Sequence, residues 1–157
     1  IHTELHRQRP DARVVVHNHP YYVSLVAALG MLPEILHQTG SLYLDDMVFV
    51  HEYDGEIDSS VLGAELAERI GDANTAILGS HGVIVCADSI ELATYRAASL
   101  DRMCRLAYDV LVSGRDPLVI GRGAQLGMQR SLIERAADVY WAGAVRAQLK
   151  KDRSVLD

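Results

Sequence analysis

Hydrophobic positions along the chain follow two repeats, one of helical period and one of strand period. Apolar residues three or four positions apart predict helices, and short β-branched runs bounded by turn residues predict strands. The predicted helices cover residues 1–9, 20–30, 32–41, 58–71, 88–111 and 128–149, and the predicted strands cover residues 13–19, 46–53, 75–78 and 83–87. Short strands mixed with longer helices indicate a single α/β or α+β domain over residues 1–157.

Residues with special backbone preferences mark the ends of several of these elements. Asp88 and Glu91 have the spacing of a capping box, which predicts the start of the long helix. Gly79 and Gly82 predict a tight turn between two buried strands, because glycine allows close backbone approach. The glycines of residues 121–127 lack the GxGxxG spacing and follow no βαβ unit, so this segment is expected to be a loop.

Composition and charge narrow the class of protein. The chain has 157 residues, of which 49% are hydrophobic, which is enough for one sizeable core. No apolar run reaches the roughly 18 residues that a membrane span needs, so no membrane partner is expected. The net charge of −6 and the lack of Lys/Arg-rich runs argue against nucleic-acid binding. Cys86 and Cys104 lack CxxC spacing and no secretory signal opens the chain, which together indicate a cytoplasmic setting.

The strongest chemical signal is the pair His17 and His19 at the end of a valine run. On a strand these two side chains share a face, so their nitrogens can converge on one ion, with bonds of roughly 2.0 to 2.1 Å for zinc. His81 lies in the glycine-flanked turn and is placed to be a third ligand. Three histidines leave an open position on the metal, as catalytic sites do. On spacing alone, surface or capping histidines remain the alternative.

The residues around the HxH pair do not match the sequence patterns of three other enzyme classes that use such a pair. A metallo-β-lactamase-like site continues as HxHxDH, whereas here Pro20 follows His19. A cupin places a glutamate shortly after its HxH, and residues 20–33 contain none. An amidohydrolase barrel needs a much longer chain. These three classes are therefore excluded.

Two segments together resemble the class II aldolase/adducin family. They are "IHTELHRQRPDARVVVHNHP" and "AILGSHGVIVCADSIELATYRAASLDRMCRLA", and the resemblance runs from residue 1 to about residue 112. It implies a three-layer α/β/α domain with a central, largely antiparallel sheet. It also implies that His17, His19 and His81 bind zinc, or another divalent metal such as Mn2+ or Co2+, in a homo-oligomer that is usually a tetramer.

The family resemblance also implies a reaction. The chain would be a metal-dependent aldehyde-lyase or carboxy-lyase that cleaves a carbon–carbon bond next to a carbonyl, through a metal-stabilised enolate or enediolate. The substrate would be a small hydroxylated carbonyl compound or acid. Two alternatives remain open. One is a related epimerase or dehydratase acting on a sugar phosphate, and the other is a non-catalytic scaffold like the adducin head domain, which lacks the histidine set.

The sequence departs from the family pattern in two places. The acid/base glutamate of the family is expected upstream of Ile1, so the catalytic residue is unknown and the front of the domain is expected to be missing. Glu4 is no substitute, because it lies on a different helical face from His2. Fuculose-phosphate aldolases carry a tyrosine at the position of Gln38. Because glutamine cannot donate a proton as a phenol does, a decarboxylase becomes more plausible than a sugar-phosphate aldolase.

Some further residues are weaker candidates for the site. His37 and Gln38 match a position near the subunit boundary of the family, where they would contact the substrate or serve in capping and interface packing. Tyr21 and Tyr22 follow the HxH pair and are expected in the core rather than in the pocket.

The remaining histidines and an acidic pair are expected to lie outside the metal site. His6 and His51 are not expected to be ligands. His2 is expected next to the missing glutamate, where it could orient that residue. Asp45 and Asp46 are expected in a solvated turn.

Overall fold

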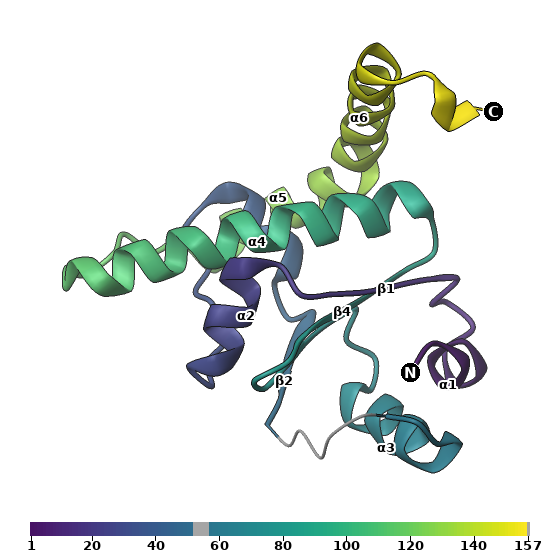
Figure 1. Ribbon diagram of the computed structural model, residues 1–157. Helices are drawn as coiled ribbons and strands as arrows, with labels where there is room; N and C mark the ends of the chain where they lie inside the picture. The colour runs from purple at the N-terminus through teal and green to yellow at the C-terminus, as the bar shows by residue number, and fades with distance from the viewer. Residues whose placement is uncertain (52–56, 157) are drawn as a thin grey trace.

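The fold is a mixed β-sheet with helices on both faces (Figure 1). The computed structural model describes residues 1–51 and 57–156. In these residues four strands form one sheet in the order β1-β4-β3-β2. The strands are β1 (Val14–Asn18), β2 (Met47–Val50), β3 (Thr75–Leu78) and β4 (Gly82–Ala87). The pairs β1–β4 and β3–β4 are antiparallel and β2–β3 is parallel, so the sheet is largely antiparallel, as the family resemblance implies.

The helices connect and cover these strands. Their bounds are α1 (His2–Gln8), α2 (Tyr21–Ala28), the 3-10 helix η1 (Gln38–Tyr43), α3 (Ser60–Ile70), α4 (Ile90–Ser113), α5 (Arg122–Ser131), the π-helical segment η2 (Leu132–Ala136), α6 (Ala137–Lys151) and the 3-10 turn η3 (Ser154–Leu156). Among the described residues, no helix is both long and apolar enough to span a bilayer.

Alternating residues of β4 divide the core into two layers. Val83 and Val85 are fully buried in a cluster with residues of α2 and α4. Ile84 and Cys86 point the other way, into a cluster with residues of α1 and α3. This alternation is what a strand buried on both faces produces. The helices α1 and α3, the sheet, and the helices α2 and α4 therefore form the three layers of the expected α/β/α fold.

Several element boundaries differ from the sequence prediction. The short helix expected over 32–41 is instead the 3-10 helix η1, which starts at Gln38. Pro33 lacks a backbone N–H and restricts the residue before it, which explains why residues 32–37 stay irregular. The sequence predicts a strand over 46–53, whereas the observed strand β2 ends at Val50. Positions 52 and 53 lie outside the described residues.

The C-terminal helical region begins earlier in the chain than the sequence pattern predicts. Residues 121–127 are not a loop, since α5 begins at Arg122 with Gly121 as its N-cap. The amide of Gln129 donates to the Leu44 carbonyl at 2.7 Å, and Arg122 pairs with Asp45. These tertiary contacts hold α5 against η1 and outweigh the low helix propensity of the glycines. Beyond η2, helix α6 projects away from the rest of the molecule (Figure 1).

Two local predictions around charged residues were wrong. The capping residue of α4 is Ser89, whose hydroxyl accepts a hydrogen bond from the Leu92 amide at 3.4 Å, in place of the expected Asp88 capping box. Asp46 is not in a solvated turn, because its carboxylate pairs with the buried Arg96 at 2.5 Å. Its neighbour Asp45 is exposed, as expected.

Candidate metal centre

The first two histidines are positioned by strand β1. His17 lies within β1 and His19 follows directly after its end. Because side chains alternate along a strand, both share the face of Val15, which packs into the core formed with α1 and α3. His17 is half-buried and His19 is exposed. The pair therefore opens to solvent at one end of the sheet.

The third histidine is positioned by the turn between β3 and β4. The amides of Gly79 and His81 donate to the carbonyls of Val50 and Leu78 at 2.8 and 3.1 Å. Ser80 adopts a left-handed conformation with φ of 53°, which is uncommon for a residue other than glycine and is held here by the surrounding contacts. A rigid turn thus fixes the direction of the His81 side chain.

Strand register brings the turn to the end of β1. Asn18 pairs with Val83 in the antiparallel ladder, and continuing this register places His19 opposite Gly82. A Cβ atom at Gly82 would lie only 2.5 Å from His19 Cδ2. The glycine therefore leaves the space that the His19 ring fills. Gly79 is needed for a similar reason, since a Cβ there would lie 2.9 Å from the His51 carbonyl oxygen.

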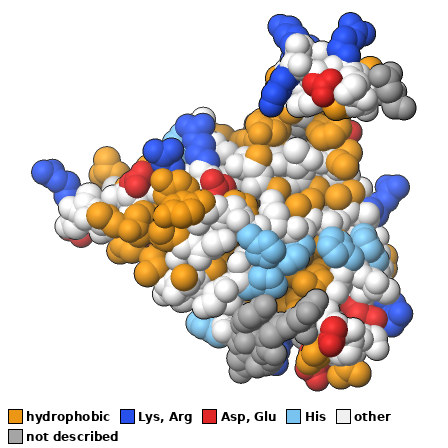
Figure 2. Space-filling view, viewed as in Figure 1, with side chains coloured by type: hydrophobic (Ala, Val, Ile, Leu, Met, Phe, Trp, Pro, Cys, Tyr) orange, Lys and Arg blue, Asp and Glu red, His pale blue; other side chains and the backbone are white. Residues whose placement is uncertain are grey.

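The three imidazole rings form a nearly equilateral triangle. The ring centres of His17 and His19 are 4.8 Å apart, and each lies 4.9 Å from the ring centre of His81. One nitrogen from each ring can be chosen so that all lie within 4.8 Å of one another. Figure 2 shows histidine side chains gathered on this face of the molecule. The structure therefore brings together the residues that the sequence singles out as ligands.

The triangle has the dimensions of a metal site. Three imidazoles bonded tetrahedrally to one zinc ion at ~2.0 Å hold their ring centres about 5 Å apart. Hydrogen bonding supports the same reading. His17 Nδ1 lies 2.9 Å from the Val83 carbonyl oxygen. Because a carbonyl only accepts, Nδ1 carries the proton and Nε2 keeps the lone pair that a metal needs, an arrangement common behind metal-bound histidines.

The electrostatics of the cluster favour neutral imidazoles. Burial lowers the pKa of His17, and the nearby His19 lowers it further, against the opposing effect of the hydrogen bond to Val83. Burial also lowers the pKa of His81, with added repulsion from His17 and His19. Neutral imidazole is the form that binds metal ions. Imidazole nitrogen is a ligand that suits zinc and related transition metals, so the donor set fits a divalent cation such as zinc.

The other histidines near this face have different surroundings. His6 Nδ1 lies 2.7 Å from the Ala12 carbonyl oxygen, so its ring joins α1 to the start of β1. The His51 ring packs on Phe49 with ring centres 4.6 Å apart. Burial lowers the pKa of His2, and His17 lowers it further, which places His2 within electrostatic range of the cluster. Glu4 is buried and pairs with Arg7 at 2.9 Å.

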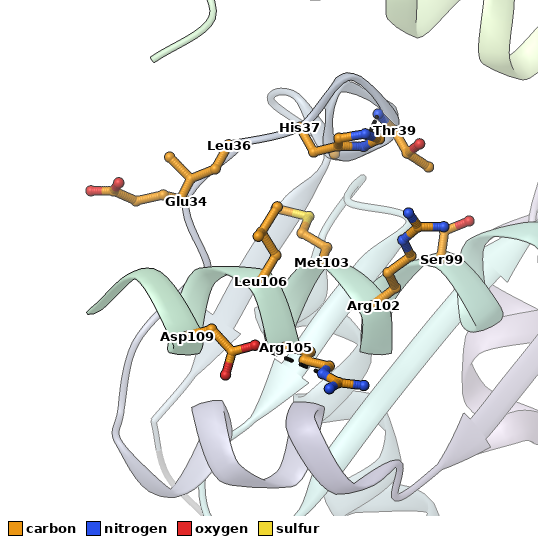
Figure 3. Close-up of a pocket in the computed structure, with 11 residues that line it drawn as sticks. Glu34, Leu36, His37, Thr39, Ser99, Arg102, Met103, Arg105, Leu106 and Asp109 are labelled. Carbon is orange, nitrogen blue, oxygen red and sulfur yellow. Dashed lines mark hydrogen bonds and ion pairs between the residues drawn. The ribbon is translucent and has the colours of Figure 1, made fainter. Parts of the chain in front are cut away.

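The weaker candidates for substrate contact lie elsewhere. His37 lines a pocket of 440 Å³ between η1 and α4, and the residues lining that pocket include none of the three clustered histidines (Figure 3). Gln38 is the exposed first residue of η1. Tyr21 was expected in the core but is 72% exposed, whereas the Tyr22 ring is partly buried against the first core cluster.

Two features of the cluster were not named by the sequence analysis. The Val83 carbonyl that orients His17 belongs to an apolar residue and gives no sequence signal. The space that Gly82 leaves for His19 had a partial signal, since the glycine beside His81 predicts close backbone approach. Both depend on which strand pairs with β1.

Comparison with known proteins adds a family context. Residues 1–108 match the family described as Class II Aldolase and Adducin N-terminal domain. The chain is similar to beta-adducin of Homo sapiens, with 26% identity over 158 residues, 98% of this chain and 20% of adducin. It is also similar to 3,4-dihydroxyphthalate decarboxylase of Arthrobacter keyseri, with 34% identity over 118 residues, 73% of this chain and 48% of that protein. The chain thus spans about half or less of these curated relatives.

Solved structures share the fold. An aldolase II superfamily protein from Pseudomonas syringae superposes with a TM-score of 0.78 at 22% identity, covering 96% of this chain and 61% of that chain. An L-fuculose 1-phosphate aldolase from Glaciozyma antarctica gives a TM-score of 0.76 at 18% identity, covering 95% and 58%. At these identities the likeness establishes a common architecture.

Proposed function

This chain belongs to the class II aldolase and adducin N-terminal domain family, and from that premise we propose that it is a divalent-metal-dependent carbon–carbon lyase. Its substrate would be a small hydroxylated carbonyl compound or acid. The observation that carries the proposal is the triangle of His17, His19 and His81, with ring centres 4.8 to 4.9 Å apart. Those three residues would hold the metal, with zinc the first candidate.

The chain's own residues prepare the site in three ways. The Val83 carbonyl fixes the His17 tautomer, the β3–β4 turn aims His81, and Gly82 leaves room for His19. When bound, a divalent cation would act as a Lewis acid that stabilises negative charge on an oxygen next to the breaking bond. Three protein ligands leave a coordination position for that oxygen.

Decarboxylation is the reaction we favour within this class. The relative named 3,4-dihydroxyphthalate decarboxylase is 34% identical, and another, decarboxylase NovR of Streptomyces niveus, is 25% identical over 132 residues. Gln38 stands where a fuculose-phosphate aldolase would have a tyrosine, which argues against that aldol cleavage. Aldol-type cleavage is the second choice, followed by epimerisation or dehydration of a sugar phosphate.

A non-catalytic scaffold is the alternative from another class. Beta-adducin aligns with 98% of this chain, which is more of the chain than the decarboxylase covers. A scaffold has no need of three converging imidazoles in a space that a glycine keeps open, so the histidine cluster favours the lyase. We further propose that residues 1–157 act as one domain in a cytoplasmic homo-oligomer, with a tetramer as the expected form.

Metal content tests the proposal directly. Inductively coupled plasma mass spectrometry of the purified protein should find about one divalent ion per chain. His17→Ala, His19→Ala and His81→Ala should each reduce that metal content at least tenfold. His51→Ala is the matched control, because it removes an exposed imidazole that packs on Phe49. Full metal retention in the three cluster variants would overturn the assignment.

Activity separates the reaction types. Carbon dioxide release from 3,4-dihydroxyphthalate and aldehyde release from L-fuculose 1-phosphate can be measured with the metal-loaded protein. Release of carbon dioxide that His81→Ala abolishes supports a carboxy-lyase. If the protein binds the metal but acts on neither probe, the result argues against these two reactions. It does not contradict the proposal that the three histidines bind a metal.

A further inference from the structure

A pocket lined by none of the three clustered histidines lies against helix α4. It has a volume of 440 Å³ and is formed by α4 together with the segment 34–40 (Figure 3). The histidine cluster lies on the α1 and α3 face of the sheet, whereas α4 covers the other face. The pocket is therefore separate from the proposed metal site, and its volume falls within the range of small-molecule sites, roughly 300 to 1,000 Å³.

The polar groups of this pocket gather around one guanidinium. Arg102 projects from α4 toward the segment that carries His37 and Thr39, as Figure 3 shows. In the part of the chain that the structure describes, Arg102 has no ion-pair or hydrogen-bond partner. The second arginine of the lining, Arg105, is already occupied by Asp109 at 3.7 Å and by the Tyr22 ring at 5.5 Å. Arg102 is thus the cation of the pocket that is available to a ligand.

The middle of the pocket is apolar. Leu36, Met103 and Leu106 line it, and Met103 is only 7% exposed. A smaller pocket of 250 Å³ shares Leu36 and Glu34 and continues along α4 past Leu111. The two pockets together form a groove that has Arg102 in the first pocket, Arg115 in the second and apolar side chains between them.

The charge of the lining selects the type of anion. Glu34 and Asp109 also line the pocket, so its two arginines and two carboxylates balance. A dianion such as phosphate would face this net neutral surface with repulsion from Glu34. A single planar carboxylate matches the paired N–H groups of one guanidinium, and an apolar body would cover Leu36 and Leu106.

We propose that this groove binds a small monocarboxylate with an elongated apolar body. Its carboxylate pairs with Arg102, and its body extends along α4 over Met103. The lining includes none of the three histidines that are proposed to hold the metal. The groove gives the chain a second ligand site on the face away from the histidine cluster.

The probe is 4-phenylbutyrate, with 4-phenylbutan-1-ol and inorganic phosphate as comparisons. Methyl resonances of protein labelled at its methionine methyl groups report where the probe binds. Met103 and Met31 line the two pockets, whereas Met47 lies on β2 and serves as the internal control. Titration with 4-phenylbutyrate should shift the methyl resonances of Met103 and Met31 and leave that of Met47 unchanged. The alcohol should bind at least fivefold more weakly, and phosphate should shift none of them.

Three variants make the result decisive. Arg102→Ala should raise the dissociation constant for 4-phenylbutyrate at least fivefold, while Arg130→Ala, an exposed arginine on α5, should leave it unchanged. The double variant His17→Ala, His19→Ala should still bind, which distinguishes this site from the metal centre. Equal affinity in Arg102→Ala and the parent protein, or loss of binding in the histidine variant, would overturn the proposal.

Discussion

Gly82 gives His19 the space that its ring occupies. A Cβ atom at position 82 would lie 2.5 Å from His19 Cδ2 and 2.6 Å from the Asn18 carbonyl oxygen, closer than real Cβ contacts come. The backbone oxygen cannot rotate away as a flexible side chain could, so the ends of β1 and β4 would have to move apart. The geometry of the histidine cluster thus depends on the absence of one methyl group.

Gly82→Ala is therefore expected to weaken metal binding without removing a ligand. We expect the affinity for Zn2+ to fall at least tenfold and the free energy of unfolding to fall by about 1 to 3 kcal/mol from overpacking. Competition with a metal chelator and urea denaturation measure the two effects. Gly127→Ala in α5 is the control, because a Cβ there has nothing within 4 Å and alanine favours the helix. An unchanged affinity in Gly82→Ala would show that the His19 position does not matter.

Adjacent aspartates should differ sharply in their effect on stability. Asp46 is 16% exposed and neutralises Arg96, which is 3% exposed, while it also accepts from the Asn74 amide at 2.9 Å. Asp46→Asn leaves a buried guanidinium without its counter-charge, which should lower the free energy of unfolding by about 3 kcal/mol. Asp45→Asn breaks only an exposed, solvent-screened pair with Arg122 and should leave the free energy of unfolding nearly unchanged. Urea denaturation of both variants measures the difference, and equal losses would contradict this reading.

Asp11 should make stability fall in acid. The Arg9 guanidinium, itself held by the Ala73 carbonyl at 2.6 Å, donates to the Asp11 carboxylate and lowers the pKa of that group from 3.8. A carboxylate with a lower pKa in the folded state adds stability above the unfolded pKa. That stability is lost as pH falls through the folded pKa.

Replacing Asp11 by Asn should therefore flatten the pH dependence of stability below about pH 4. Urea midpoints measured from about pH 6 to about pH 2.5 test this, with Asp116→Asn in the loop after α4 as the matched control. Identical acid profiles for Asp11→Asn and the parent protein would show that the contact with Arg9 adds nothing.

Both cysteines should be unreactive in the folded protein. Cys86 and Cys104 are fully buried, and burial raises the pKa of Cys104 to about 12. At pH 8 only roughly one Cys104 thiol in ten thousand is then the reactive thiolate. A chromogenic disulfide reagent should detect no thiols in the native protein at this pH and two after unfolding in guanidinium chloride. Rapid labelling of the native protein would mean that the core opens at Cys104.

The local geometry of the site follows from the sequence alone. Side chains alternate along any strand, so the spacing of His17 and His19 at the end of a valine run was sufficient to place both on one face. The glycines around His81 likewise predicted the tight turn between β3 and β4. These features follow from backbone geometry within a few residues. The three-layer fold was expected from the resemblance of the two quoted segments to the class II aldolase/adducin family.

Features that depend on contacts between distant residues became visible only in the folded chain. His81 meets the other two histidines only because β4 pairs antiparallel with β1, with Asn18 opposite Val83. The start of α5 at Arg122 depends on contacts with Asp45 and Leu44, and so could not be read from a glycine-rich segment. Propensity and period describe neighbours along the chain, whereas register and packing are set by the free energy of burying surfaces that are far apart in sequence.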